Sequence, residues 1–204
     1  MYVLHNNPFP HITTDGLIGP KLLTRIDETI LRTDFTRWKG YDSRGGSRQK
    51  FQFNMSKEKK PLTRDDGTHP LEEVLDTRDI ISIWDQAGKN VIDNYRLLNV
   101  VNSDDRPFNS VSIELVRSIT PEWQTAYARY DTNRCQTIIM LRWQGHDKHL
   151  GKGFEVKLGK KAMGNLIPWH IGHSFTYIPD DKTTFVKYPV TSFKTCTFIN
   201  VGLR

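Results

Sequence analysis

The residues most able to do chemistry lie in one short segment, YARYDTNRCQTIIML, which spans residues 127–141. Arg129 precedes Asp131 by two positions, and an apolar run typical of a β-strand follows. A His-x-Asp pair at this spacing would offer a metal two ligands, but a guanidinium has no lone pair to give. Alternate strand residues share one face, so Arg129 and Asp131 are expected to point the same way and form an ion pair.

Four histidines form two short motifs further along the chain, HDKH at residues 146–149 and HIGH at residues 170–173. His-x-x-His is a possible spacing for metal ligands. If His170 and His173 lie on a strand, however, a separation of three sends their side chains to opposite faces. Polar histidines in turns are therefore expected, and a metal site is the alternative.

Other catalytic signatures do not appear in the sequence. Serine, cysteine and histidine form no nucleophile motif, and GYDSRGGSRQK lacks the spacing of a phosphate-binding loop. Cys135 and Cys196 fall in predicted strands and are expected to be buried thiols. The 29 Lys and Arg against 23 Asp and Glu give a net charge of +6, a mild excess that does not by itself indicate a nucleic-acid-binding protein.

The elements that must position these side chains change character near residue 110. Before it, IGPKLLTRIDETILRT places apolar residues on one helical stripe with Pro20 in the first turn, and residues 71–98 give the strongest helical pattern. After it the period switches to two, which predicts strands at 111–119, 124–130, 136–143, 153–158, 173–178, 183–188 and 195–201. Helices followed by antiparallel strands predict a single mainly β domain, residues 1–204, with flanking helices.

A basic segment from Arg37 to Arg64 interrupts this order. It holds nine Lys and Arg, interleaved with large aromatic residues, and is expected to be a long loop insertion with one short strand near residues 51–53. A solvated loop is the plainest interpretation. The mixture of charge and aromatic residues also suits a contact surface. The predicted partner-binding residues are Trp38, Tyr41, Arg44, Arg48 and Lys50.

Several segments together resemble the iron(II)- and 2-oxoglutarate-dependent oxygenases of the prolyl-hydroxylase-like type. They are PFPHITTDGLIGPKLLTRI near the start, then YDTNRCQTIIMLRW, GKGFEVKL, LIPWHIGHSFTYIPDDKTTFVKYPV and FKTCTFINVG, and they cover most of the chain. The resemblance implies a double-stranded β-helix, which is jelly-roll-like, with two N-terminal helices packed on its outer face.

The same resemblance implies an iron site made of two histidines and one carboxylate, with open positions for 2-oxoglutarate and oxygen. The His-x-Asp pair falls on Arg129 and Asp131, and the second histidine falls on Val186, which has no donor atom. The basic residue that pairs the far carboxylate of 2-oxoglutarate falls on Lys194. The metal site is therefore expected to be degenerate, with Arg129 supplying the positive charge that iron otherwise supplies beside Asp131.

These observations predict a non-catalytic binding or structural module, without cofactor, on an oxygenase fold. A protein partner or self-association is expected, and a component of a phage virion is one role that would fit. The alternative is an active iron(II) and 2-oxoglutarate hydroxylase of protein side chains, with His146, His170 or His173 as a ligand in another strand register. A second alternative, a nucleic-acid-binding module, rests on the basic segment. The N-terminus does not resemble a signal peptide, and no sequence window resembles a membrane span. The protein is therefore expected to be cytoplasmic when it is made, and to be found in the virion if it is a virion component.

Overall fold

The computed structural model describes residues 2–40, 48–56, 61–62, 69–99, 110–118, 125–127, 134–143, 153–158, 163–179, 184–187 and 196–204. The helical elements are α1 (Pro20–Arg32), η1 (Phe35–Arg37), η2 (Leu71–Glu73), α2 (Thr77–Ile83), a π-helical turn (Trp84–Gly88) and α3 (Lys89–Asn99). The strands before residue 110 are β1 (Tyr2–His5), β2 (His11–Asp15), β3 (Arg48–Ser56), β4 (Pro61–Leu62) and β5 (His69–Pro70). The later strands are β6 (Ser110–Ser118), β7 (Thr125–Tyr127), β8 (Cys135–Trp143), β9 (Gly153–Leu158), β10 (Asn165–Pro168), β11 (His173–Tyr177), β12 (Thr184–Lys187) and β13 (Cys196–Leu203).

The helices begin where the sequence signals place them. Pro20 lies in the first turn of α1, where its missing N–H leaves no bond unmade. The apolar stripe predicted for this helix, Leu22, Leu23, Ile26, Ile30 and Leu31, is buried at Leu22, Ile26 and Ile30, whereas Leu31 is exposed. The carboxylate of Asp76 accepts a hydrogen bond from the backbone N–H of Arg78 at 2.7 Å and so caps α2. The helical pattern predicted for residues 71–98 is thus confirmed as α2, the π-helical turn and α3.

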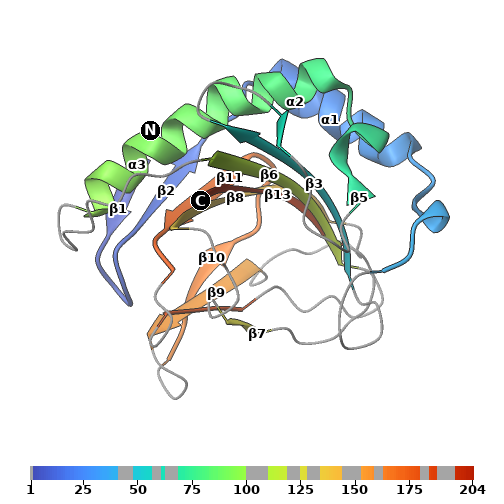
Figure 1. Cartoon of the computed structure of the whole chain (residues 1–204). Coiled ribbons are helices and arrows are strands. Elements are labelled where there is room, and N and C mark those ends of the chain that lie inside the picture. Colours follow the sequence, from blue (N-terminus) through green and yellow to red (C-terminus); the bar gives the residue numbers. More distant parts are fainter. Residues whose placement is uncertain are drawn as a thin grey trace.

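Two sheets face each other in the molecule (Figure 1). The larger has the order β1-β2-β11-β8-β13-β6-β3-β4, with β5 paired to β3, and the smaller has the order β10-β9-β12-β7. The three α-helices arch over the convex face of the larger sheet, and the smaller sheet lies on its concave side. We call these two faces of the larger sheet the outer and the inner face.

Alternate residues of the larger sheet point to its outer face and form a buried core there with the helices. Along β3, Phe51, Phe53 and Met55 join the buried cluster that includes the apolar stripes of the helices. The same cluster takes alternate residues of the neighbouring strands: Val111, Ile113, Leu115, Cys135, Ile139, Leu141, Ile199, Val201 and Leu203. The residues between them point to the inner face, because successive side chains of a strand point to opposite sides. The inner face of the larger sheet therefore faces the smaller sheet. We call the space between the two sheets the inside of the barrel, and a site placed there would be lined by the inner face.

The strands predicted after residue 110 are all present, with boundaries shifted by at most a few residues. β10 was missed, because its four residues end in Pro168 and show no clear alternation. The basic segment needs a larger correction. Residues 48–56 form a nine-residue strand of the larger sheet, not a loop with a short piece at residues 51–53. Its polar residues alternate with apolar ones, as in a strand with one solvated face, but the charge of the surrounding segment favoured a solvated loop.

Both cysteines are free and buried, as predicted. Burial raises the pKa of the Cys135 thiol far above its ordinary value, so this thiol stays protonated and unreactive. No helix in the described ranges is both long and apolar enough to cross a membrane.

His11 gives the fold a predictable pH dependence. Its ring is almost fully buried at the start of β2, where Nδ1 lies 2.9 Å from the carbonyl oxygen of Phe9 and the ring stacks on His5. Burial lowers the pKa of His11 below 6.5, and the neighbouring His5 acts in the same direction. The unfolded chain therefore binds this proton more readily, so the free energy of unfolding falls as the pH drops through 6.5 toward the folded-state pKa.

We expect His11 to contribute a slope of at most about 1.4 kcal/mol per pH unit in that window. Urea unfolding at several pH values between 5 and 7.5 measures it. The His11→Asn variant keeps a nitrogen donor near the Phe9 carbonyl but does not titrate, so the slope should shrink. An unchanged slope would assign the pH dependence to other groups.

Candidate functional site

The strands that would carry an iron site are neighbours in the smaller sheet. β7 pairs antiparallel with β12, and Val186 stands opposite Ala126 while Phe185 stands opposite Tyr127. Val186 is thus on the strand that the resemblance implies for the second histidine. Arg129, Asp131 and Lys194 lie outside the described residues, so their ion pair and the cosubstrate role of Lys194 stay predictions.

The histidine motifs do not supply a substitute site within the described residues. His146 and His149 lie outside them. The rings of His170 and His173 are 6.1 Å apart, and Nδ1 of His173 lies 2.6 Å from Oδ1 of Asp15. The contact with His173 lowers the pKa of the Asp15 carboxyl. Among the described side chains, no group of three or more His, Cys, Asp or Glu residues is placed to hold a metal ion.

His173 also begins β11 at the far end from the chain segment that would hold Asp131. Tyr177, at the other end of β11, pairs with Gln136 at the start of β8. Asp131 precedes the first residue of β8 by four positions. The distance along the strand from His173 to Tyr177 is about 13 Å. His173 and the start of β8 therefore lie at opposite ends of this strand pair, while Asp131 lies outside the described residues and the alternative with His173 as a ligand stays a prediction.

The polar side chains of the inner face gather toward the end at which β6 and β8 begin. Backbone pairing places Gln52, Glu114 and Asn200 in one row across β3, β6 and β13. Asn54 and Ser112 stand in the next row. Lys50 and Arg204 reach Glu114 from either side. We call these seven residues the Glu114 cluster: Lys50, Gln52, Asn54, Ser112, Glu114, Asn200 and Arg204.

Glu114 is the buried charge at the centre of this cluster, with a side chain 4% exposed. Its Oε1 lies 2.8 Å from Nζ of Lys50 and 3.4 Å from Nη2 of Arg204. Its Oε2 accepts a hydrogen bond from Nδ2 of Asn200 at 3.1 Å. Removing a carboxylate from water costs several kcal/mol unless it is paired and hydrogen-bonded, and Glu114 is both. Two protein cations therefore neutralise the carboxylate inside the barrel.

Three buried polar atoms of the cluster have no hydrogen-bond partner in the described part of the chain: Oε1 of Gln52, Oγ of Ser112 and Oδ1 of Asn200. An unmade hydrogen bond in an interior costs about 1–3 kcal/mol. A carboxylate only accepts hydrogen bonds, so the amide nitrogen of Asn200 must face Glu114 and its oxygen must point elsewhere. The cluster thus presents acceptors suited to a group with N–H or O–H donors.

Aromatic side chains fill the other half of the inner face. Phe154 of β9 is fully buried and stacks on Trp169 at 5.5 Å with an interplanar angle of 15°. Its ring also lies 5.2 Å from Phe175 and 5.4 Å, edge on, from Phe198. The remaining members of this second buried cluster are Phe9, Val116, Ile138, Met140, Val156, Ile167, Tyr177 and Cys196. This half of the barrel is therefore a packed core between the two sheets.

The predicted partner-binding residues are dispersed by the fold. Tyr41 and Arg44 lie outside the described residues. Trp38 packs against Phe51, and its indole N–H donates to Oε2 of Glu73 at 2.7 Å. Arg48 and Lys50 lie on β3, and Lys50 pairs with Glu114. Their role in partner binding stays a prediction, while Lys50 gains a role inside the sheet.

The sequence analysis missed the Glu114 cluster, although a signal was present. Gln52 and Asn54 alternate with Phe51 and Phe53, which is a period of two. Polar residues at such positions usually indicate a solvated face. A covering second sheet turns that face inward, and only the three-dimensional structure shows this.

No protein-family model matches the chain, and comparison with curated proteins gave no match. Solved structures do match. A prolyl-4-hydroxylase from Pseudomonas putida aligns with a TM-score of 0.57 at 10% identity, over 95% of this chain and 91% of that one. IDO from Bacillus thuringiensis aligns at 0.56 and 7%, over 95% and 89%. The Fe(II)/(alpha)ketoglutarate-dependent dioxygenase TqaL aligns at 0.56 and 11%, over 95% and 82%.

The resemblance to iron(II)- and 2-oxoglutarate-dependent dioxygenases is thereby confirmed at the level of the fold. The donor set is a separate question. The resemblance assigns the iron-ligand positions to Arg129, Asp131 and Val186, and this assignment stays a prediction, since Arg129 and Asp131 lie outside the described residues. One carboxylate, one guanidinium and one isopropyl group do not fit an iron(II) site with two nitrogen ligands.

Proposed function

We propose that this chain is a non-catalytic binding module on a double-stranded β-helix of the oxygenase type. The Glu114 cluster is the observation that carries the proposal. It presents unpaired acceptors of Gln52, Ser112 and Asn200 around a carboxylate that protein cations already neutralise. Such a surface holds a polar group by hydrogen bonds and needs no metal to do so. The ligand class is a group with N–H or O–H donors, such as an amide or hydroxyl side chain of a partner.

The aromatic half of the barrel supports the same interpretation. An oxygenase of this type must leave room inside the barrel for a dicarboxylate cosubstrate and a basic residue to pair it. Here Phe154, Phe175 and Phe198 meet in that interior with ring distances of 5.2–5.4 Å. Burying large aromatic rings stabilises the two-sheet packing, because each removes roughly 150–250 Å² of surface from water.

We expect iron(II) and 2-oxoglutarate together to leave the melting temperature of the protein unchanged. A site that holds both at about a hundred times the dissociation constant would add about 2.7 kcal/mol, which is roughly 5 °C or more for a chain of this size. Thermal unfolding under anaerobic conditions, with zinc alone as a control, measures this. A clear shift that requires both ligands and disappears in Asp131→Ala would establish the alternative, an active hydroxylase.

A matched gain-of-binding variant tests the assigned positions separately. Arg129→His combined with Val186→His rebuilds two histidines and one carboxylate, the set that holds iron(II) in non-haem oxygenases. We expect this double variant, unlike the wild type, to be stabilised by iron(II). A double variant that folds but gains no metal-dependent stability would show that these residues do not correspond to iron ligands.

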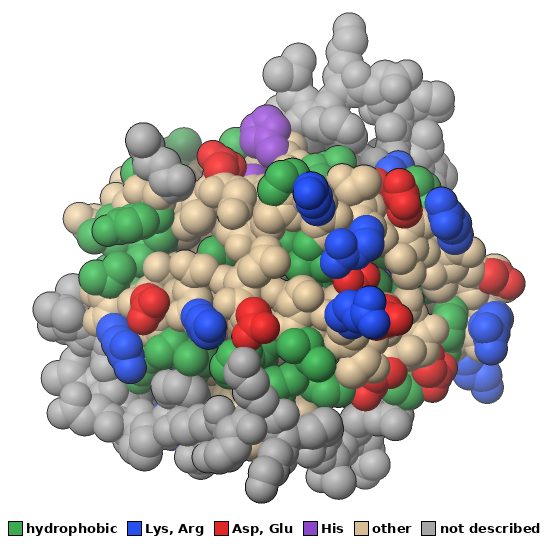
Figure 2. Space-filling model, turned by 90° about the horizontal axis from the view of Figure 1, so that it is seen from above, with side chains coloured by type: hydrophobic (Ala, Val, Ile, Leu, Met, Phe, Trp, Pro, Cys, Tyr) green, Lys and Arg blue, Asp and Glu red, His purple; other side chains and the backbone are tan. Residues whose placement is uncertain are grey.

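The described part of the helix-covered face offers no support to the nucleic-acid alternative. Figure 2 looks onto the helix-covered face and shows Lys and Arg interspersed with Asp and Glu. Three ion pairs lie on the helices there: Arg25–Asp79, Arg32–Glu28 and Arg96–Asp93. Proteins that bind nucleic acid typically carry a basic patch or stripe on their surface. A protein partner, in a virion or elsewhere, is therefore the preferred proposal, with the segment from Trp38 to Lys50 as its contact region.

A further inference from the structure

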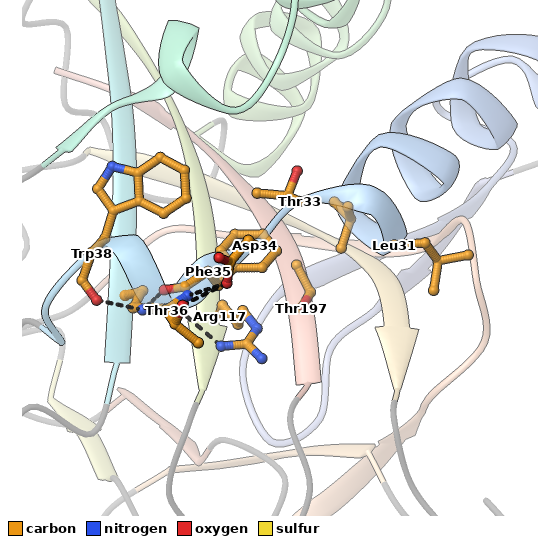
Figure 3. Close-up of a pocket in the computed structure, with 10 residues that line it drawn as sticks. Leu31, Thr33, Asp34, Phe35, Thr36, Trp38, Arg117 and Thr197 are labelled. Atoms are coloured by element: carbon orange, nitrogen blue, oxygen red, sulfur yellow. Dashed lines mark hydrogen bonds between the residues drawn. The ribbon is translucent and has the colours of Figure 1, made fainter.

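A pocket lies on the outer face of the larger sheet, away from the Glu114 cluster. It opens between the C-terminal end of α1 with the following turn η1 and the neighbouring strands β3, β6 and β13. Figure 3 shows Asp34, Phe35 and Trp38 on one side of it and Arg117 and Thr197 on the other. Its volume of about 460 Å³ lies within the range of small-ligand sites.

Arg117 is held in this pocket by two contacts. Its Nη1 donates to Oε1 of Gln49 at 3.0 Å, and its guanidinium carbon lies 4.7 Å from the centre of the Phe35 ring. Gln49 cannot turn over, because its Nε2 donates to the carbonyl oxygens of Phe35 at 2.8 Å and Trp38 at 3.0 Å. The guanidinium is therefore fixed in position before any ligand arrives.

The charge of Arg117 is not matched by an acid among the described residues, where no ion pair to it occurs. Burial lowers the pKa of this arginine, which is the mark of a cation partly removed from water. A guanidinium has five N–H donors in a rigid fork, and the bond to Gln49 uses one of them. Two arginines at α1 are by contrast paired with acids: Arg25 of the helix with Asp79, and Arg142 of β8 with Asp27 of the helix.

Asp34 limits what this cation can bind. Its Oδ1 accepts hydrogen bonds from the backbone N–H of Thr36 at 3.0 Å and from its hydroxyl at 2.6 Å. These bonds lower the pKa of the Asp34 carboxyl, so it stays ionised at the pocket wall. Arg117 and Asp34 both line the pocket, and one positive with one negative charge there favours a singly charged anion over a phosphate dianion.

We propose that this pocket binds a carboxylate through the fork of Arg117, with Phe35 and Trp38 contacting the apolar part of the same ligand. The carboxylate belongs to an acidic side chain of a protein partner or to a small organic acid. The pocket lies on the outer face and uses none of the Glu114 cluster, but Trp38 and Gln49 also belong to the segment that we propose as the partner-contact region.

The test is a ¹⁵N–¹H NMR titration of the full chain that follows the Nε–H signals of its arginines. The signal of Arg117 is assigned by its loss in Arg117→Met. Probes are butyrate, which is a singly charged carboxylate, a blocked peptide with one central glutamate, and inorganic phosphate, at constant ionic strength. We expect saturable shifts at Arg117 with both carboxylates and weaker ones with phosphate, while Arg25 and Arg142 stay unchanged as internal controls.

The two sources of carboxylate are separated by affinity. Binding of the peptide at least about tenfold tighter than butyrate assigns the pocket to an acidic partner side chain, and the reverse assigns it to a free organic acid. Asp34→Asn should tighten both, because it removes the opposing charge, and Arg117→Lys should weaken both, because it loses the fork. Equal, unsaturable shifts of all three arginines, or tighter binding of phosphate than of either carboxylate, would overturn the proposal.

Discussion

Replacing Phe154 with alanine should lower the free energy of unfolding by about 3–5 kcal/mol. Its ring is fully buried between the sheets, stacked on Trp169 and in contact with Phe175 and Phe198. Removing the ring loses the free energy gained when it is transferred from water to the protein interior. It also leaves a cavity that two hydrogen-bonded sheets cannot readily close. Urea unfolding followed by tryptophan fluorescence and by circular dichroism measures the loss.

Two control variants on β9 show whether the predicted loss of stability comes from the buried ring of Phe154. Phe154→Leu keeps an apolar side chain of similar reach and should cost less than half as much. Leu158→Ala alters the exposed end of the same strand, where the side chain is 45% exposed, and should change stability by about 0.5 kcal/mol or less. Equal losses in Phe154→Ala and Leu158→Ala would mean that the rings do not form a packed core, and that this half of the barrel is open.

The strands and helices were largely predictable because local patterns determine them. The apolar stripe of α1, buried at Leu22, Ile26 and Ile30, is a short-range signal, and so is the cap that Asp76 gives α2. The resemblance also identified the fold correctly, since strand order and turn spacing survive when individual residues do not. What the sequence could not supply was which polar face is covered.

β3 is the clearest case of this limit. Its polar residues sit within a basic segment, so composition favoured a solvated loop. In the structure Lys50 instead meets Glu114, a residue 64 positions later that carried no signal of its own. Pairing between distant strands creates that contact, and no local pattern encodes it. The Arg117 pocket was missed for the same reason, because Gln49, Phe35 and Arg117 come from separate elements.

Loss of one charge from the Glu114 cluster is the second large effect that we expect. Lys50→Met leaves a nearly buried carboxylate with a longer contact to Arg204 at 3.4 Å and the amide of Asn200. Breaking a buried pair typically costs about 3–5 kcal/mol. The lower end applies here, because 27% of the Lys50 side chain remains exposed. Glu114→Gln should cost less, since Gln can still accept hydrogen bonds and the cations it releases can reach water.

A double-mutant cycle of Lys50→Met and Glu114→Gln isolates the interaction between the two charges, and its coupling energy should be about 1–3 kcal/mol. The exposed pair Arg96–Asp93, with side chains 74% and 68% exposed, is the matched control and should give about 0.5 kcal/mol or less. Added salt should erase the control coupling and leave most of the buried one, because screening acts through solvent. If Lys50 and Glu114 prove uncoupled, only the longer contact with Arg204 is left to neutralise the carboxylate inside the barrel. The carboxylate would then be open to a cation from outside, and the case for a module that works without a metal would lose its main support.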